Sequence, residues 1–322
     1  MLQQFSLPVA NELKAFDVQY QNILKTGDQR FQFLLDFISE TNGKRIRPLT
    51  VFLVAKLCGT PNRKTLDYAL ILELLHNATL VHDDVVDNTK ERRGQPSAMA
   101  QFGNQIAVLL GDYILSKAIT LGVATENIPI LKILATVAQN LSEGELTQLI
   151  GATEPVIDEN RYFEIIRKKT AILLASCAEM GAMSVDADAE TIQTLRLVGE
   201  NIGLCFQLRD DIFDYYEQGD IGKPTGNDIR EGKITLPLLY ALQTASPMQV
   251  AEMMKLIRTQ DFSAENIRRL LDFAKQHNGV EYAQEKMMHI KQETIRLLQR
   301  FPDSETKQAL LQLIAYTIER KK

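Results

Sequence analysis

Segments of apolar residues at helical spacing dominate this sequence. The apolar residues between Leu66 and Ala78 cover nearly all sides of a helix, as is typical of a helix buried in a core. Residues 130–141 and 195–206 repeat apolar side chains every three or four positions, and no segment bounded by turn residues shows convincing strand alternation. Most prolines fall between such segments and mark their ends. The pattern predicts an all-α helical bundle.

The length of 322 residues by itself suggests about two domains, at roughly 150 residues each. No low-complexity linker divides the sequence, however, and the sequence shows no internal repeat of the kind that builds solenoids. We therefore expect a single domain that covers residues 1–322.

The composition excludes several classes of protein. The 36 Lys and Arg residues are outnumbered by 41 Asp and Glu residues, and this net charge of −5 argues against nucleic-acid binding. The three cysteines are too few and too scattered for a disulfide framework or a zinc site. We see no signal peptide and no apolar stretch that approaches the ~20 residues of a membrane span. These features predict a cytoplasmic protein without a membrane span.

Two acidic motifs of the form D-D-x-x-D each end a strongly apolar segment. Asp83 and Asp87 stand four residues apart, so both carboxylates project from one helix face about 6 Å apart. Asp210 and Asp214 repeat this spacing later in the chain, and Asp84 and Asp211 complete the motifs. Oxygen ligands at this spacing suit Mg²⁺, which takes one or two carboxylates together with water and substrate phosphate. A solvated helix end would explain one such motif more readily than two.

Basic residues flank both acidic motifs. They stand in residues 43–48 (GKRIRP), in residues 91–94 directly after the first motif, in residues 168–169, and in residues 222–233 after the second motif. Arginine matches the paired oxygens of a phosphate, and lysine supplies a point charge. One cluster alone is more often a solvated surface. The placement of several clusters beside both carboxylate motifs indicates metal-bridged diphosphate binding.

One histidine, His76, stands seven residues before Asp83, which puts it about 10 Å away on the same helix face. A lone histidine in an apolar helix is usually a core residue, so a structural role and a ligand contact both remain open. His82 directly precedes the acids and could support them, whereas His277 and His289 stand far from every motif.

In this order, the motifs resemble the trans-isoprenyl diphosphate (polyprenyl) synthases. The resemblance runs from Gly43 to Pro237 and also includes residues 111–113 (GDY) and 235–237 (TLP). It implies an isoprenoid synthase-like bundle of helices around a central cavity, with the two acidic motifs facing each other across it. It also implies a homodimer. Small departures from the family pattern at Asn42, Ser97 and Lys117 leave the chemistry intact.

The resemblance further implies a role for each matching residue. About three Mg²⁺ ions in each active site would be held by Asp83, Asp87 and Asp210, with Asp84, Asp211 and Asp214 in support. The site for isopentenyl diphosphate would contain Lys44, Arg47, His76 and Arg93. The allylic diphosphate would be bound by Arg92, Lys169, Thr170, Gln207, Lys223 and Lys233, and the cations among these would stabilise the leaving diphosphate. The allylic cation would then be attacked by the double bond of isopentenyl diphosphate.

Two features favour a long product. In the resembling family, bulky residues four or five positions before the first motif stop the growing chain, and here these positions hold the small residues Thr79 and Ala78. In the first motif, two residues separate the Asp83–Asp84 pair from the third aspartate, Asp87, whereas short-chain bacterial enzymes of the family usually have four residues there. Since one helical turn rises about 5.4 Å, about the length of one isoprene unit, we expect a product of about C30–C50, near octaprenyl. A quinone side chain would be its use.

Alternative functions remain open at this point. The chain could be a geranylgeranyl or farnesyl diphosphate synthase whose chain-length floor lies elsewhere. It could also be a subunit of a heteromeric synthase, although such subunits typically lose one or both acidic motifs and this chain keeps both. A terpene cyclase is disfavoured, because it normally has a different second metal motif and lacks basic residues such as Lys44 and Arg47.

Overall fold

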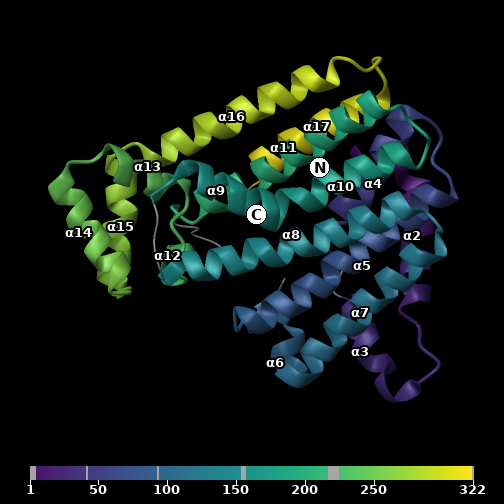
Figure 1. The fold of residues 1–322 in the computed structure, drawn as a ribbon, viewed down its shortest axis with the longest axis horizontal. Helices are drawn as coiled ribbons and strands as arrows, with labels where there is room; N and C mark the ends of the chain where they lie inside the picture. Colours follow the sequence, from purple (N-terminus) through teal and green to yellow (C-terminus); the bar gives the residue numbers. More distant parts are fainter. Residues whose placement is uncertain (1–4, 41–42, 93, 154–156, 217–224, 321–322) are drawn as a thin grey trace. The chain divides into compact units, whose positions relative to one another are not determined.

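The computed structural model describes residues 5–40, 43–92, 94–153, 157–216 and 225–320. These residues are helical nearly throughout, and the strands in this part of the chain are β1 (Glu91–Arg92) and β2 (Gln95–Pro96), which form one antiparallel ribbon. The predicted all-α class is confirmed (Figure 1).

The chain folds into two compact units, each built from three segments of the sequence. The first unit consists of Met1–Ala138, Leu173–Gly199 and Gln299–Leu313, and the second consists of Gln139–Ile172, Glu200–Leu298 and Ile314–Lys322. Neither unit is a continuous stretch of sequence. The expectation of one domain around a central cavity stays a prediction.

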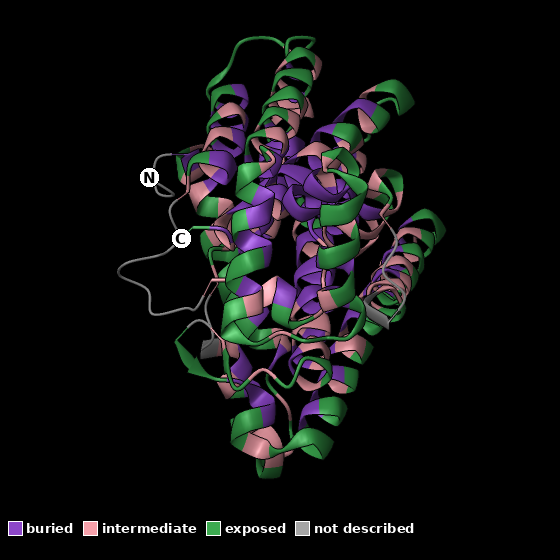
Figure 2. Ribbon diagram, turned by 90° about the vertical axis from the view of Figure 1, so that its left-hand side faces the viewer, coloured by how far each residue is buried: buried purple, intermediate pink, exposed green. Residues whose placement is uncertain are grey.

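Among the helices of the first unit, the long apolar helix α5 (Arg63–Val86) is largely buried. The others are η1 (Leu7–Val9), α2 (Ala10–Ile23), α3 (Gln29–Glu40), α4 (Ile46–Cys58), α6 (Ala98–Phe102), α7 (Asn104–Ala124) and α10 (Ile172–Met183), with the first parts of α8 (Ile128–Thr153), α11 (Ala189–Phe213) and α17 (Glu305–Glu319). Leu70, Ile71 and Leu72 on α5 are fully buried, as the apolar pattern predicted. Figure 2 shows buried, intermediate and exposed residues alternating along the helices.

Helix α5 begins with a capping box. The side chain of Asn62 accepts hydrogen bonds from the backbone of Lys64 and Thr65, and the Thr65 hydroxyl accepts one from the backbone of Asn62. Satisfying these otherwise free amide groups stabilises the helix start. The helix runs without interruption from this cap to the first acidic motif.

The second unit contains the remaining parts of α8, α11 and α17, together with shorter helices. These are α9 (Glu159–Ile166), the π-helical turn η2 (Arg167–Ala171), α12 (Asn227–Arg230), α13 (Leu236–Thr244), α14 (Pro247–Arg258), α15 (Ala264–Gln276) and α16 (Gly279–Leu298). Its core includes Leu208 and Ile212 of α11 and Leu236 of α13, which are fully buried.

Two glycines place the π-helical turn of the second unit. A Cβ atom on Gly144 of α8 would lie 2.9 Å from the backbone nitrogen of Lys169, and one on Gly203 of α11 would lie 2.5 Å from the Cα of Ala171. Larger residues at either position would push the turn away. This turn contains Lys168, Lys169 and Thr170, and π-helical turns occur frequently at functional sites.

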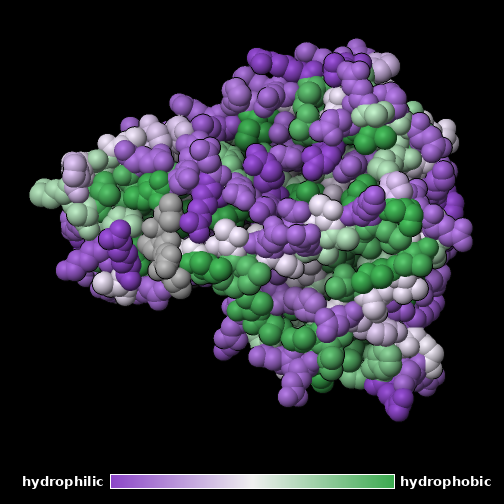
Figure 3. Space-filling model, viewed as in Figure 1, coloured by the Kyte–Doolittle hydropathy of each residue, from purple (hydrophilic) through white to green (hydrophobic). Residues whose placement is uncertain are grey.

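Much of the apolar surface of helix α7 is exposed. The helix is 21 residues long, its most apolar 18-residue window has a mean hydropathy of 1.6, and by length and composition it could cross a membrane. Only 33% of its most apolar window is buried. Hydrophobic side chains on the molecular surface are visible in Figure 3. The expectation that no stretch approaches the length of a membrane span is therefore not confirmed.

Candidate active site

The first acidic motif forms the last turn of α5, and its three carboxylates have different environments. Asp83 is half-buried and Asp87, the residue that caps the helix end, is exposed. Asp84 is only 3% exposed, and its Oδ1 accepts hydrogen bonds from Nε (2.7 Å) and Nη2 (2.6 Å) of Arg92. A buried carboxylate needs such a partner. Asp84 therefore positions Arg92 on the β-ribbon.

His82 anchors this motif to α7. Its Nε2 lies 3.2 Å from the carbonyl oxygen of Val108 and 3.3 Å from Oδ1 of Asp112. The close approach requires a glycine, because a Cβ atom on Gly111 would lie 2.3 Å from the His82 Nε2. Gly111 thus leaves space for the imidazole ring of His82, and Asp112 contacts its Nε2 atom.

The basic segment at the start of α4 contains one cation with a structural role and two with other environments. Arg45 adopts the left-handed backbone conformation (φ 50°), and its guanidinium binds Glu73 at 2.8 Å and lies 4.6 Å from the ring centre of Tyr20. Burial opposes its charge, but the carboxylates of Glu73 and Asp17 outweigh this effect and raise the pKa of Arg45. Arg45 therefore holds the segment in place, whereas Lys44 is exposed and Arg47 half-buried.

Three further predicted site residues lie on α5, N-terminal to the first motif. His76 is buried at 7% exposure, Ala78 is buried at 1%, and Thr79 is half-buried with its hydroxyl donating to the His76 carbonyl at 2.9 Å. Their functional roles stay predictions. Ala78 lies within the packed part of the helix, so a larger side chain there must displace its surroundings.

The second acidic motif lies at the end of α11, and its carboxylates also differ in burial and in hydrogen-bond partners. Asp211 is 3% exposed and accepts hydrogen bonds from the Tyr162 hydroxyl (2.5 Å) and from Nε2 of Gln207 (2.8 Å). Burial raises the pKa of Asp211 to about 6. Asp214 accepts from the backbone nitrogens of Asn227 (2.9 Å) and Asp228 (3.0 Å) and thereby caps α12.

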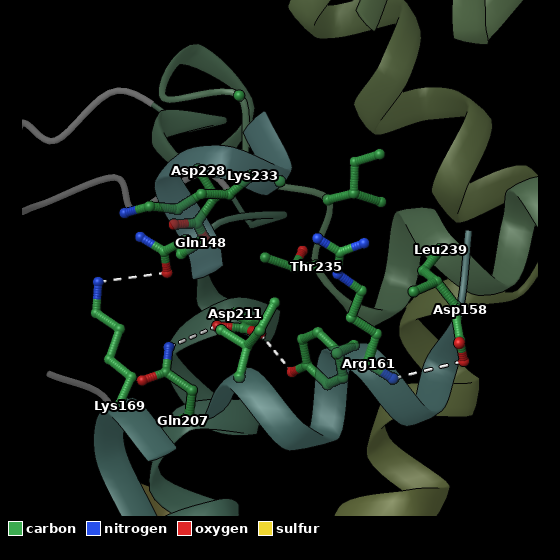
Figure 4. A pocket seen from close by; sticks show the side chains of 15 residues that line it. Gln148, Asp158, Arg161, Lys169, Gln207, Asp211, Asp228, Lys233, Thr235 and Leu239 are labelled. Carbon is green, nitrogen blue, oxygen red and sulfur yellow. Dashed lines mark hydrogen bonds between the residues drawn. The ribbon is translucent and has the colours of Figure 1, made fainter. Parts of the chain in front are cut away.

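Basic and amide side chains of the second unit line one pocket with Asp211 (Figure 4). The pocket has a volume of about 150 Å³. The predicted residues Lys169, Gln207 and Lys233 line it, as does Asp228. Burial raises the pKa of Asp228 to about 8. The structure thus brings together three of the predicted ligands of the allylic diphosphate.

A hydrogen-bond chain connects the π-helical turn to this pocket. The Thr170 hydroxyl donates to Oε1 of Gln207 at 2.7 Å, and Gln207 in turn donates to Asp211. The Lys169 ammonium lies 2.6 Å from Oε2 of Glu145 and 3.3 Å from Oε1 of Gln148. Lys169 is therefore held by α8 and points toward the pocket.

Sequence reasoning missed several residues of the site. Tyr162, Glu145 and Gln148 bind predicted site residues, and Arg161 also lines the pocket. Glu145 and Gln148 stand three residues apart in an apolar helix, and this spacing was an available signal. The partnership of Tyr162 with Asp211 spans 49 residues and left no local signal.

Two predicted residues, Arg93 and Lys223, lie outside the described residues. Within the described ranges, no three His, Cys, Asp or Glu side chains form a ready-made metal cluster. The donor chemistry nevertheless fits a hard cation, because Asp83, Asp87 and Asp210 offer carboxylate oxygens and no sulfur or nitrogen.

The helical fold and a pocket that gathers lysines around a buried aspartate define a chain of the prenyl diphosphate synthase type. A family model described as polyprenyl synthetase matches residues 28–273. The chain belongs to this family, as the sequence motifs predicted.

Individual proteins agree with this assignment. Octaprenyl diphosphate synthase of Haemophilus influenzae is 35% identical, with 88% of this chain and 86% of that protein covered. The crystal structure of a Caulobacter crescentus polyprenyl synthase complexed with calcium and isoprenyl diphosphate is 30% identical, with a TM-score of 0.90 and coverage of 100% and 98%. A geranylgeranyl pyrophosphate synthase structure from Bacteroides thetaiotaomicron is 38% identical, with a TM-score of 0.85 and coverage of 98% of each chain.

Proposed function

We propose that this enzyme joins isopentenyl diphosphate to an allylic diphosphate primer and makes a long-chain trans-polyprenyl diphosphate of about C30–C50. One observation carries the proposal beyond family membership. Lys169, Gln207 and Lys233 line one pocket next to the second acidic motif, and they offer the contacts that a diphosphate needs. In the reaction, the allylic C–O bond breaks, the isopentenyl double bond attacks the resulting cation, and a proton is lost to the departing diphosphate.

The enzyme's own side chains have distinct tasks in this proposal. Lys169, Gln207 and Lys233 bind the allylic diphosphate together with Arg92, and Lys44, Arg47 and His76 bind isopentenyl diphosphate. Asp84 orients Arg92, and Tyr162 and Gln207 orient Asp211. Orientation before binding matters because preorganised charges stabilise the leaving diphosphate without reorganisation during the reaction.

The calcium in the Caulobacter structure supports a requirement for a divalent metal. We propose that about three Mg²⁺ ions serve each active site, held by Asp83, Asp87 and Asp210. When bound, they would neutralise the charge that develops on the leaving diphosphate. Asp84, Asp211 and Asp214 would act in support, and the structure already gives each of them partners within its own unit: Arg92 for Asp84, Tyr162 and Gln207 for Asp211, and the start of α12 for Asp214.

The long product is supported by the small residues Ala78 and Thr79 and by the octaprenyl relative. A geranylgeranyl product is the second candidate, because the Bacteroides structure shares 38% identity over nearly the whole chain. Purified enzyme incubated with Mg²⁺, farnesyl diphosphate and labelled isopentenyl diphosphate decides between them. Chromatography of the dephosphorylated products should show chains of about C30–C50. A product that stops at C20 supports the second candidate, and no incorporation supports a subunit of a heteromeric synthase.

Exposed apolar residues on α7 support a homodimer. Leu109 is 68% exposed, Val123 56% and Ile119 48%, which is unusual for large apolar side chains. A second copy of this helix would cover these residues. Light scattering of the purified protein should give twice the mass of 36.4 kDa, and a Leu109→Glu variant should shift it toward the monomer.

The setting of the reaction remains part of the proposal. All three cysteines, which lie in the described part of the chain, carry free thiols, as suits the reducing cytoplasm. A polyprenyl product would be consumed as a quinone side chain. Growth of a quinone-deficient strain with this chain, followed by analysis of the quinone tail, tests that use.

A further inference from the structure

The C-terminal end of the described chain reaches the second acidic motif. Arg320 directly follows α17, and its side chain is only 9% exposed. Its Nη2 lies 2.5 Å from Oδ1 of Asp210 and 3.2 Å from the carbonyl oxygen of Phe206. Its guanidinium lies 3.9 Å from the ring centre of Phe206. The arginine that follows α17 thus holds the first carboxylate of the motif.

A second arginine strengthens this contact at an electrostatic cost. Nη2 of Arg209 donates to the backbone oxygen of Arg320 at 3.3 Å, and its guanidinium lies 4.2 Å from the ring centre of Phe213. Burial and the charge of Arg320 lower the pKa of Arg209. The Nε atoms of both arginines are buried without a hydrogen-bond partner. Two neighbouring cations with unsatisfied donors are a poor arrangement for stability alone.

The other two carboxylates of the second acidic motif are held by partners other than Arg320. Asp211 is held by Tyr162 and Gln207, and Asp214 caps α12. Asp210 remains 43% exposed, and Arg320 contacts it through Oδ1. The ring and the carbonyl oxygen of Phe206 hold the guanidinium of Arg320, so its hydrogen bond reaches Oδ1 of Asp210 from a fixed position and leaves the carboxylate charged.

We propose that Arg320 is a positioning residue that orients Asp210 for metal binding. This inference rests on the proposed function, which makes Asp210 a metal ligand. Arg320 restricts the carboxylate before the metal arrives, so less conformational freedom is lost on binding. Groups that orient a metal ligand in this way change metal affinity by about 10- to 100-fold when they are removed.

The test measures metal binding directly. Mn²⁺ is titrated by electron paramagnetic resonance into the full-length enzyme with farnesyl S-thiolodiphosphate, an allylic analogue that does not react. Arg320→Gln should weaken Mn²⁺ binding by about 10-fold or more. Arg320→Lys, which keeps the charge but loses the planar fork, should give an intermediate affinity.

Glu319→Gln is the matched control. It removes the neighbouring contact between Glu319 and Lys291 (3.8 Å) at the same end of α17 without touching Asp210, and it should leave Mn²⁺ affinity unchanged. Thermal unfolding without metal shows whether each variant is folded, and if Arg320→Gln unfolds, the Lys variant decides. Equal Mn²⁺ affinity of the folded Arg320 variants and the wild type overturns the proposal. A wild type that binds Mn²⁺ but makes no prenyl product refutes the proposed function and leaves this comparison intact.

Discussion

The ammonium of Lys169 and the Oε2 atom of Glu145 lie 2.6 Å apart, although Lys169 is expected to bind diphosphate. The lysine and glutamate side chains are 25% and 15% exposed, so the pair is partly shielded from water. Diphosphate binding must therefore compete with Glu145 for the same cation.

Glu145→Gln should release Lys169 for anion binding. Because a partly shielded ion pair contributes about 1 kcal/mol, inorganic diphosphate should inhibit the variant about 5-fold more strongly. The measurement is the inhibition constant of inorganic diphosphate against the allylic substrate. Glu143→Gln is the control, because Glu143 binds the adjacent Lys168 at 3.2 Å and should have no such effect. An unchanged constant in the Glu145 variant would contradict the competition.

Ala78→Phe should shorten the product. A phenyl ring at this buried position, five residues before Asp83, would block the growing chain near its start. Chromatography of the dephosphorylated products should show a shift to C15–C20, and Ala78→Leu should give intermediate lengths. Thermal unfolding of both variants separates a blocked chain path from a damaged core. Unchanged product lengths in a folded variant would rule out this path for the tail.

Tyr162→Phe should destabilise the protein more than Tyr215→Phe. The Tyr162 hydroxyl binds the carboxylate of Asp211 at 2.5 Å, whereas the Tyr215 hydroxyl lies 3.2 Å from the neutral hydroxyl of Thr235. Hydrogen bonds to charged groups contribute about 1.5–3 kcal/mol and neutral ones about 0.5–1.5 kcal/mol. Urea unfolding of the two variants measures the difference, and equal losses would show that Asp211 does not depend on Tyr162.

Gly111→Ala should destabilise the contact between α5 and α7 by about 1–3 kcal/mol. The added Cβ would lie 2.3 Å from Nε2 of His82, so the imidazole ring must move. In the His82→Ala background the same substitution should cost much less, because the clashing ring is gone. A double-mutant cycle by urea unfolding measures this coupling, and additive losses would refute the clash.

Stability should fall as pH rises toward 8, in part because of Asp228. Burial raises the pKa of this carboxyl from 3.8 to about 8, so between these values the folded protein binds a proton that the unfolded chain has released. The free energy of unfolding therefore decreases as the pH rises across this window. Asp228→Asn should flatten the fall between pH 5 and pH 8. Thermal unfolding over that range is the measurement, and parallel curves for the two proteins would contradict the assignment.

The expectations from sequence succeeded where the information is local. The apolar periodicity of residues 66–78 predicted a buried helix, and α5 is buried along that stretch. The π-helical turn at Lys169 could not be foreseen in the same way. It depends on the close approach of Gly144 and Gly203, which come from other helices.

By itself the sequence determined the helical class, the two acidic motifs, the basic clusters and the family, because spacing and order along the chain carry this information. Only the tertiary structure decided what each carboxylate does. Asp84 holds Arg92, Asp211 is buried against Tyr162, Asp214 caps α12, and Asp210 is held by Arg320. The six aspartates look alike in the sequence, and they differ because their partners stand up to 110 residues away and meet them only after folding.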